Sequence, residues 1–74
     1  MQSFIVKLFH KPGSRVEVLL EKEIRFGALR RPRTQFRVCE RDRITGKRQS
    51  NVWYDEYEQA VGEYATRVGG RLDS

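Results

Sequence analysis

The chain has 74 residues, which is enough for one domain with a small core and too few for a deep catalytic pocket. We therefore predict a single domain over residues 1–74 that is not an enzyme. Charged residues make up 34% of the chain, yet the apolar residues fall in periodic blocks, which argues against a disordered chain. One cysteine, Cys39, and one histidine, His10, are too few for a disulfide or a zinc site, so we expect no metal and no cofactor.

Nothing near the start of the chain predicts a membrane segment. The apolar run of residues 4–9 is interrupted by Lys7, and it is far shorter than the ~20 residues that a membrane helix needs. No small-residue cleavage site follows it. We expect a cytoplasmic protein that makes no membrane contact.

Residues 3–26 predict a first β-hairpin. Residues 3–10, SFIVKLFH, are rich in β-branched and aromatic side chains. Pro12 and Gly13 suit neighbouring positions of a tight turn, because Pro presets φ and Gly tolerates a positive φ. In residues 15–26 apolar and charged side chains alternate, which favours a returning strand over the helix that its Leu and Glu residues also permit.

A basic loop and a second hairpin are predicted next. Residues 27–33 have no usable period, and Pro32 favours an extended conformation for the residue before it, so we expect a loop. From residue 34 onward apolar side chains and arginines alternate, which is typical of a half-buried strand. Gly46 suits the turn of a second hairpin over residues 34–53.

Residues 55–68 predict one amphipathic helix. Asp55 and Glu58 resemble a capping box, and the two glycines at 69–70 are expected to end the helix and leave residues 71–74 as a frayed tail. The apolar stripe expected to pack on the sheet consists of Tyr57, Ala60, Val61, Tyr64, Ala65 and Val68. The outer face is expected to carry Glu56, Glu63 and Arg67. The predicted fold class is therefore α+β, a four-stranded antiparallel sheet of two hairpins with one C-terminal helix on one face.

Positive charge is concentrated in residues 25–48. This stretch holds nine of the 15 Lys and Arg residues and two of the ten acidic residues, and eight of the nine cations are Arg. The planar fork of Arg matches phosphate oxygens and base edges, so we expect these side chains to contact a polyanion. The expected contact residues are Arg30, Arg31, Arg33, Arg37, Arg41, Arg43, Lys47, Arg48, Gln49 and Asn51. The alternative is that the arginines pair across the sheet with Glu17, Glu21 and Glu23.

The run QFRVCERDRITGKRQSNVWYDEYEQAVGEYATRV, residues 35–68, carries a turn, an aromatic residue and a helical alanine in a characteristic order. These features are Asp42, Thr45, Gly46, Lys47, Arg48, Trp53 and Ala60. The run resembles the amino-terminal DNA-binding domain of tyrosine recombinases, or phage integrases, which is similar to the plant ethylene-response-factor fold. That family inserts a three-stranded sheet into the DNA major groove. The resemblance implies this role for Arg37, Arg41, Lys47, Arg48, Gln49 and Asn51, although the acidic helix start at residues 54–56 departs from the family pattern.

The order of four strands and a helix is also similar to that of the single-strand-binding transcriptional coactivators, which dimerise and lay single strands over a basic sheet. That resemblance implies base stacking on Phe26, Phe36 or Trp53. Ordinary burial preferences instead place Trp53, Tyr57 and Tyr64 in the core.

Two functional hypotheses follow from these patterns. The first is a small basic nucleic-acid-binding module, with duplex DNA as the preferred partner, that grips phosphates through the arginine-rich loop and hairpin. The alternative is a small phage or mobile-element interaction protein that docks the same basic face on an acidic surface of a host protein and inhibits it. Apolar side chains on both faces of the first strand also predict a homodimer.

Overall fold

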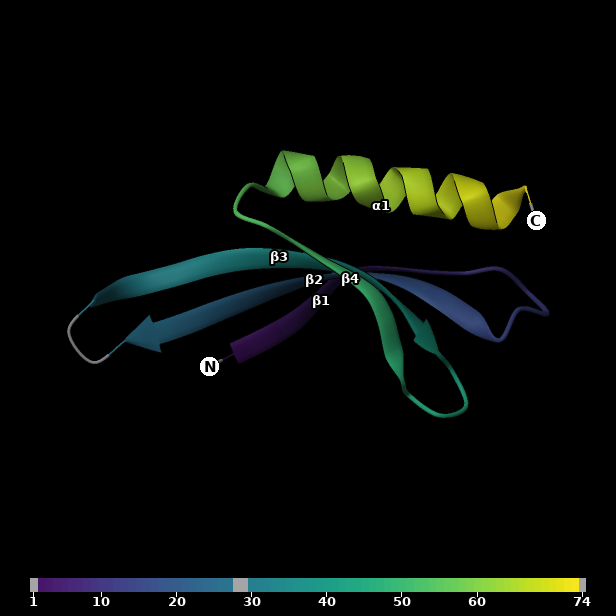
Figure 1. Ribbon diagram of the computed structural model, residues 1–74, viewed down its shortest axis with the longest axis horizontal. Helices are drawn as coiled ribbons and strands as arrows, with labels where there is room; N and C mark the ends of the chain where they lie inside the picture. Colours follow the sequence, from purple (N-terminus) through teal and green to yellow (C-terminus); the bar gives the residue numbers. More distant parts are fainter. Residues whose placement is uncertain (1, 28–29, 74) are drawn as a thin grey trace.

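The computed structural model describes residues 2–27 and 30–73, except for the side chain of Arg30. Four strands and one helix follow one another along the chain: β1 (Gln2–His10), β2 (Val16–Gly27), β3 (Arg30–Asp42), β4 (Arg48–Tyr54) and α1 (Tyr57–Leu72). The strands form one antiparallel sheet in the order β1-β2-β3-β4, and α1 lies across one face of it (Figure 1). The predicted α+β fold of two hairpins and a C-terminal helix is confirmed.

The core lies between α1 and the middle of the sheet. Leu20 of β2, Val38 of β3 and Ala60 of α1 are fully buried and pack together. Ala60 has a small side chain, so the helix backbone comes close to the sheet at this point. The partly buried side chains packed around this centre are Phe36, Tyr54, Val61 and Tyr64.

The other face of the sheet, here called the open face, has no helix over it (Figure 1). Side chains directly opposite one another in an antiparallel ladder share a face, so the register defines its members. They are Ser3, Ile5, Leu8 and His10 of β1, Glu17, Leu19, Glu21, Glu23 and Arg25 of β2, Arg33, Gln35, Arg37, Cys39 and Arg41 of β3, and Arg48 and Trp53 of β4. Leu19 and Cys39 are fully buried although they lie on this face. Long neighbouring side chains must therefore extend over them.

Both hairpin turns depend on a glycine with a positive φ. In the first, Gly13 has a φ of 86°, and the N–H of Ser14 donates to the carbonyl of Lys11 over 3.0 Å. In the second, Gly46 has a φ of 75°, and its N–H donates to the carbonyl of Asp42 over 2.8 Å. Both turns were predicted from the positions of these glycines.

The predicted basic loop at residues 27–33 is largely strand. β2 extends to Gly27 and β3 begins at Arg30, so only residues 28–29, which lie outside the described residues, separate them. Beyond Ile24, β2 and β3 pair only with each other, because the pairing of β1 with β2 and of β4 with β3 does not extend that far. This two-stranded extension, residues 25–27 and 30–33, is called the arm. Pro32 is tolerated there because neither edge of a two-stranded ribbon is covered by a third strand.

The helix differs from its prediction at both ends. It begins at Tyr57, and the residue before it, Glu56, makes no side-chain capping hydrogen bond. The helix continues through the glycines at 69–70 to Leu72. Each glycine costs about 1 kcal/mol in a helix, and an ion pair of 3.1 Å between Arg71 and Glu40 of β3 ties down the last turn. The predicted frayed tail is therefore helical over its first two residues, and residue 74 lies outside the described part.

Candidate nucleic-acid interface

Glu21 is the centre of an ion-pair network on the open face. Its side chain is 5% exposed, and one oxygen accepts hydrogen bonds from Arg37 Nη2 at 2.9 Å and Arg37 Nε at 3.3 Å. Arg48 reaches across β3 and donates from Nε and Nη2 to the two oxygens, at 3.2 and 3.1 Å. Burial alone would raise the pKa of Glu21, but the hydrogen bonds and charges of Arg48 and Arg37 outweigh it and hold the pKa below its ordinary value.

Cys39 lies beneath the side chain of Arg48. Arg48 of β4 stands opposite Arg41 of β3, and its ion-pair partner Glu21 of β2 stands opposite Arg37 of β3. To reach Glu21, the guanidinium of Arg48 therefore crosses β3 at the position between Arg37 and Arg41, which is Cys39. Cys39 Sγ donates to Glu21 Oε1 over 3.6 Å. Burial and the charge of Glu21 raise the pKa of the thiol, which keeps it protonated and unreactive at neutral pH.

Two further glutamates of β2 repeat this arrangement on either side. Glu17 binds Arg41 at 2.6 Å and Arg43 at 3.9 Å, and Glu23 binds Arg25 at 2.7 Å. Both glutamate side chains are 8% exposed. The carboxylates of β2 therefore form a buried row, and the guanidiniums lie outside it.

A fourth acid, Asp55, follows β4 and binds side chains of β3 at the base of the arm. Its Oδ1 accepts hydrogen bonds from Gln35 and Arg33, both at 3.2 Å. These two bonds and the charge of Arg33 hold the pKa of Asp55 below its ordinary value. Asp55 thus binds the sheet and does not cap the helix, in contrast to the sequence prediction.

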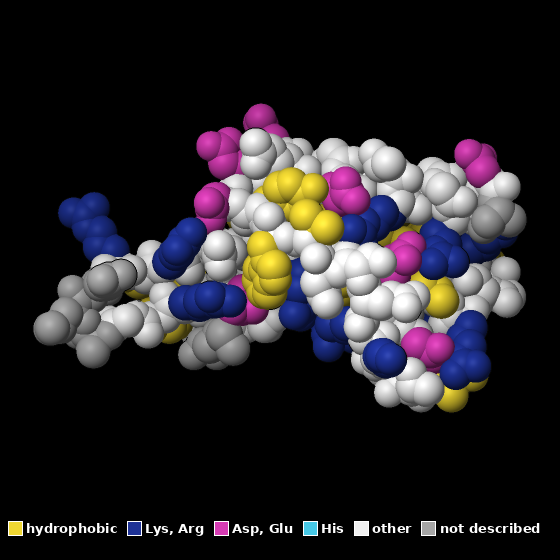
Figure 2. Space-filling model, in the orientation of Figure 1, with side chains coloured by type: hydrophobic (Ala, Val, Ile, Leu, Met, Phe, Trp, Pro, Cys, Tyr) yellow, Lys and Arg dark blue, Asp and Glu magenta, His cyan; other side chains and the backbone are white. Residues whose placement is uncertain are grey.

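The network partly neutralises the basic stretch. Within the described residues it joins six guanidiniums, those of Arg25, Arg33, Arg37, Arg41, Arg43 and Arg48, to the four carboxylates of Glu17, Glu21, Glu23 and Asp55. Figure 2 shows positive and negative side chains next to one another below the helix. Pairing across the sheet, the alternative considered from the sequence, is what the structure contains. Two positive charges are left over within the network.

Trp53 is the aromatic side chain of the open face, and it is 39% exposed. The guanidinium carbons of Arg37 and Arg25 lie 5.1 and 5.4 Å from the centre of its ring, which is within the range of cation–π attraction. Tyr57 is 42% exposed and packs edge-on against Phe36 at 5.4 Å on the helix side. The predicted burial of Trp53 and Tyr57 is wrong, because a two-layer fold leaves one sheet face and the end of the helix without a covering layer; Tyr64 does pack on the core.

The predicted contact residues are only partly brought together. Arg33, Arg37, Arg41, Arg43 and Arg48 belong to the network described above. Arg31 is exposed on the arm and Lys47 is exposed in the second turn, while the side chain of Arg30 lies outside the described part. Gln49 stands opposite Glu40, which binds the helix residue Arg71, so it faces the helix side. Asn51 is exposed in the irregular stretch between Gln49 and Val52.

Arg25 and Gln35 belong to the open face but were absent from the predicted set. The signal for both is their position in the alternating strands, Arg25 opposite Arg33 and Gln35 opposite Glu23. Arg67 was predicted on the outer face of the helix, yet its side chain is 13% exposed and binds Glu63 at 2.8 Å. It lies one heptad after Ala60, on the side of α1 that carries this core residue. Its Nη1 atom is buried without a hydrogen-bond partner.

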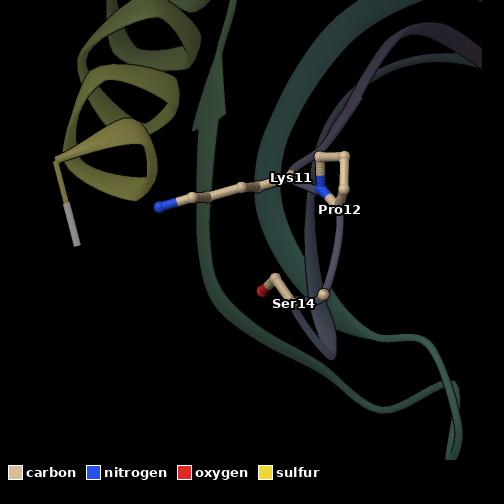
Figure 3. A pocket seen from close by; sticks show the side chains of 4 residues that line it. Lys11, Pro12 and Ser14 are labelled. Atoms are coloured by element: carbon tan, nitrogen blue, oxygen red, sulfur yellow. The ribbon is translucent and has the colours of Figure 1, made fainter.

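The rest of the described chain supplies little chemistry. The turn between β1 and β2 lines a depression, formed by Lys11, Pro12, Gly13 and Ser14 (Figure 3). No group of three or more His, Cys, Asp or Glu residues in the described ranges could hold a metal ion. No helix of the described part is long and apolar enough to cross a membrane.

The chain was compared with known families, proteins and structures. No protein family, curated protein or solved structure matches it.

Proposed function

We propose that the chain is a nucleic-acid-binding module that holds duplex DNA against the open face and the arm. The observation that carries the proposal is Trp53, an exposed indole with the guanidiniums of Arg37 and Arg25 over its ring. The core does not need this side chain, because α1 covers the opposite face. Exposed aromatic and arginine side chains together bind bases, sugars and phosphates.

The shape of the sheet supports a duplex as the partner. The molecule is 46 Å long, mostly along its strands (Figure 1), which exceeds one DNA turn of about 34 Å. The arm is two strands wide, and the major groove admits a two-stranded ribbon. The integrase-like turn at residues 42–48 agrees with this mode, and the resemblance to that family stays a prediction.

The ion pairs of the open face determine how strongly the proposed binding depends on salt. A phosphate that contacts Arg37, Arg41 or Arg48 competes with a carboxylate that already holds the guanidinium. Few counterions are therefore released on binding, and the salt dependence is shallower than nine cations would imply. With two to four effective phosphate contacts, affinity falls roughly 10- to 150-fold between 50 and 200 mM salt.

Fluorescence anisotropy with labelled duplex DNA, single-stranded DNA and a structured RNA tests the proposal. Trp53→Leu is expected to weaken duplex binding roughly 5-fold, the lower end of the about 1–3 kcal/mol that base–aromatic stacking contributes to single-strand binding, because the bases of a duplex are already stacked on one another. Tyr57→Leu is the matched control, because Tyr57 is equally exposed but lies on the helix side. It should leave the affinity within about two-fold of the unaltered chain.

Three results would count against the proposal. Absence of binding to all three nucleic acids at low salt would end it. Equal losses in the Trp53 and Tyr57 variants would remove the open face from the binding surface. Retention of a protein partner after nuclease treatment and a high-salt wash would instead favour the alternative, an inhibitor of a host protein.

A further inference from the structure

β1 is an edge strand with one side unpaired. Eight of its nine residues pair with β2, all along one edge, so in the described part of the chain its other edge presents a row of main-chain N–H and C=O groups about 30 Å long. The complement of such a row is another β-strand, because only a strand offers acceptors and donors at the same spacing. The occupant of this edge is therefore expected to be a strand.

The side chains of β1 are apolar and exposed on both sheet faces. Phe4, Ile5, Val6 and Leu8 are between 41% and 50% exposed, and Ile5 and Leu8 lie on the open face opposite Glu21 and Leu19. The core residues under α1 come from β2, β3 and β4, so the helix leaves β1 uncovered. A long apolar edge of this kind marks an interaction site.

We propose that β1 pairs antiparallel with β1 of a second copy of this chain and forms one continuous eight-stranded sheet. Charge favours a copy of β1 over a nucleic acid or an acidic peptide, since Lys7 is the sole Lys or Arg of the strand and no acid accompanies it. The other sheet edge, β4, carries the exposed polar side chains of Gln49, Ser50 and Asn51, which complement apolar side chains poorly. Pairing of β1 with β4 would also add molecules without end, whereas β1 with β1 closes at two.

The available area sets the strength of the dimer. The exposed half of a large apolar side chain is roughly 80 Å², so four such side chains from each copy bury roughly 650 Å². With the main-chain edges the total approaches about 1,000 Å², the lower end of specific interfaces. The bulge between Ile5 and Lys7 interrupts the strand and limits the ladder to the runs on either side. The dimer is therefore weak and forms only at high protein concentration.

Symmetry predicts how the dimer is arranged. A two-fold axis perpendicular to the sheet reverses the strand direction but keeps each face on its own side. Both helices then lie on one side, and the two open faces lie side by side on the other. The dimer does not rest on nucleic-acid binding, and its test contains no nucleic acid.

Sedimentation equilibrium of the purified chain from about 10 µM to about 1 mM tests the proposal. The mass is expected to rise from 8.8 kDa toward twice that value. Ile5→Lys and Leu8→Lys each place a second cation beside Lys7 at the edge and should remain at 8.8 kDa. Phe26→Lys is the matched control, because Phe26 is 59% exposed and lies on the arm, away from this edge; it should dimerise like the unaltered chain.

Thermal melts followed by circular dichroism confirm that each variant is folded, and amide hydrogen exchange locates the contact. The amides of β1 should become more protected at high concentration, while those of β4 should not change. A mass of 8.8 kDa at all concentrations would overturn the proposal. So would dimers of the Ile5 and Leu8 variants, loss of the dimer in the Phe26 variant, or protection confined to β4.

Discussion

Replacing Glu21 with Gln should lower the stability of the fold and raise its affinity for DNA. Glu21 is buried and accepts four hydrogen bonds from Arg37 and Arg48. Removing one member of a buried pair costs about 3–5 kcal/mol. Here the two guanidiniums are 20% and 34% exposed, so water compensates part of the loss, and we expect a fall of about 2 kcal/mol in the free energy of unfolding.

The affinity should change in the opposite direction. Without the charge of Glu21, Arg37 and Arg48 lose the carboxylate that competes with phosphate. One additional phosphate contact at 0.1 M salt strengthens binding by roughly 5- to 10-fold. A variant with lower stability but higher DNA affinity would show that Arg37 and Arg48 contribute to folding and to binding through different contacts.

Chemical denaturation and anisotropy on the same samples measure the two effects, and 10–15 °C keeps the variant folded during the binding assay. A loss of about 2 kcal/mol corresponds to a fall of roughly 8–16 °C in Tm for a domain of this size. Glu58→Gln is the control, because it removes the same charge from the exposed first turn of the helix. It should change stability by less than about 0.5 kcal/mol and affinity by less than about two-fold. Weaker DNA binding by folded Glu21→Gln protein would refute the competition between carboxylate and phosphate.

Three further predictions concern acid stability and the glycines. The pKa of Glu21 is held below its ordinary value in the fold, so its contribution to the free energy of unfolding is present above the unfolded-state pKa and is lost as the pH falls through the folded-state pKa. Acid titration of the free energy of unfolding should show this fall, and Glu21→Gln should flatten it. Gly46→Ala should lower the free energy of unfolding, measured by urea denaturation, by about 1–2 kcal/mol, because alanine is strained at a φ of 75°. An unchanged midpoint would mean that Gly46 does not need its positive φ. Gly70→Ala should add about 0.5–1 kcal/mol to the same free energy, because this position is helical and a Cβ there meets nothing within 4 Å; a loss would mean that the helix ends before it.

The elements and their faces could be predicted because periodicity is a local property. Alternation along residues 15–26 and 34–41 assigns each side chain to one of two faces, and the structure keeps Glu17, Glu21 and Arg37 on the same face. The ends of elements were less predictable. Residues 30–33 have no hydrophobic period, and the described side chains of the arm, those of residues 25–26 and 31–33, are exposed. Residues 30–33 nevertheless pair with β2 through main-chain hydrogen bonds that side chains do not reveal.

The candidate site depends on contacts between distant parts of the chain, and this limits prediction from sequence. The alternation shows that Glu21 and the arginines can meet, but choosing between ion pairs within the molecule and contacts with a partner needs the strand register. Arg48, 27 residues from Glu21, reaches it only because β4 follows β3 in the sheet. Trp53 was placed in the core by average burial preference, which takes no account of a sheet with one uncovered face.

The buried glutamates explain how a domain of this size can display so many arginines. Unpaired guanidiniums at this density would repel one another and oppose folding, whereas the row of Glu17, Glu21 and Glu23 pairs with five of them, those of Arg25, Arg37, Arg41, Arg43 and Arg48. Under the proposed function, the same row would make nucleic-acid binding an exchange, in which a phosphate replaces a carboxylate and not merely a water molecule. A partner that offers oxygens at the spacing of the guanidiniums then binds better than an equally charged but flexible polymer, because the ordering of these arginine side chains has already occurred on folding. Competition of polyphosphate with duplex DNA measures this preference directly: at equal phosphate concentration, the duplex should be retained.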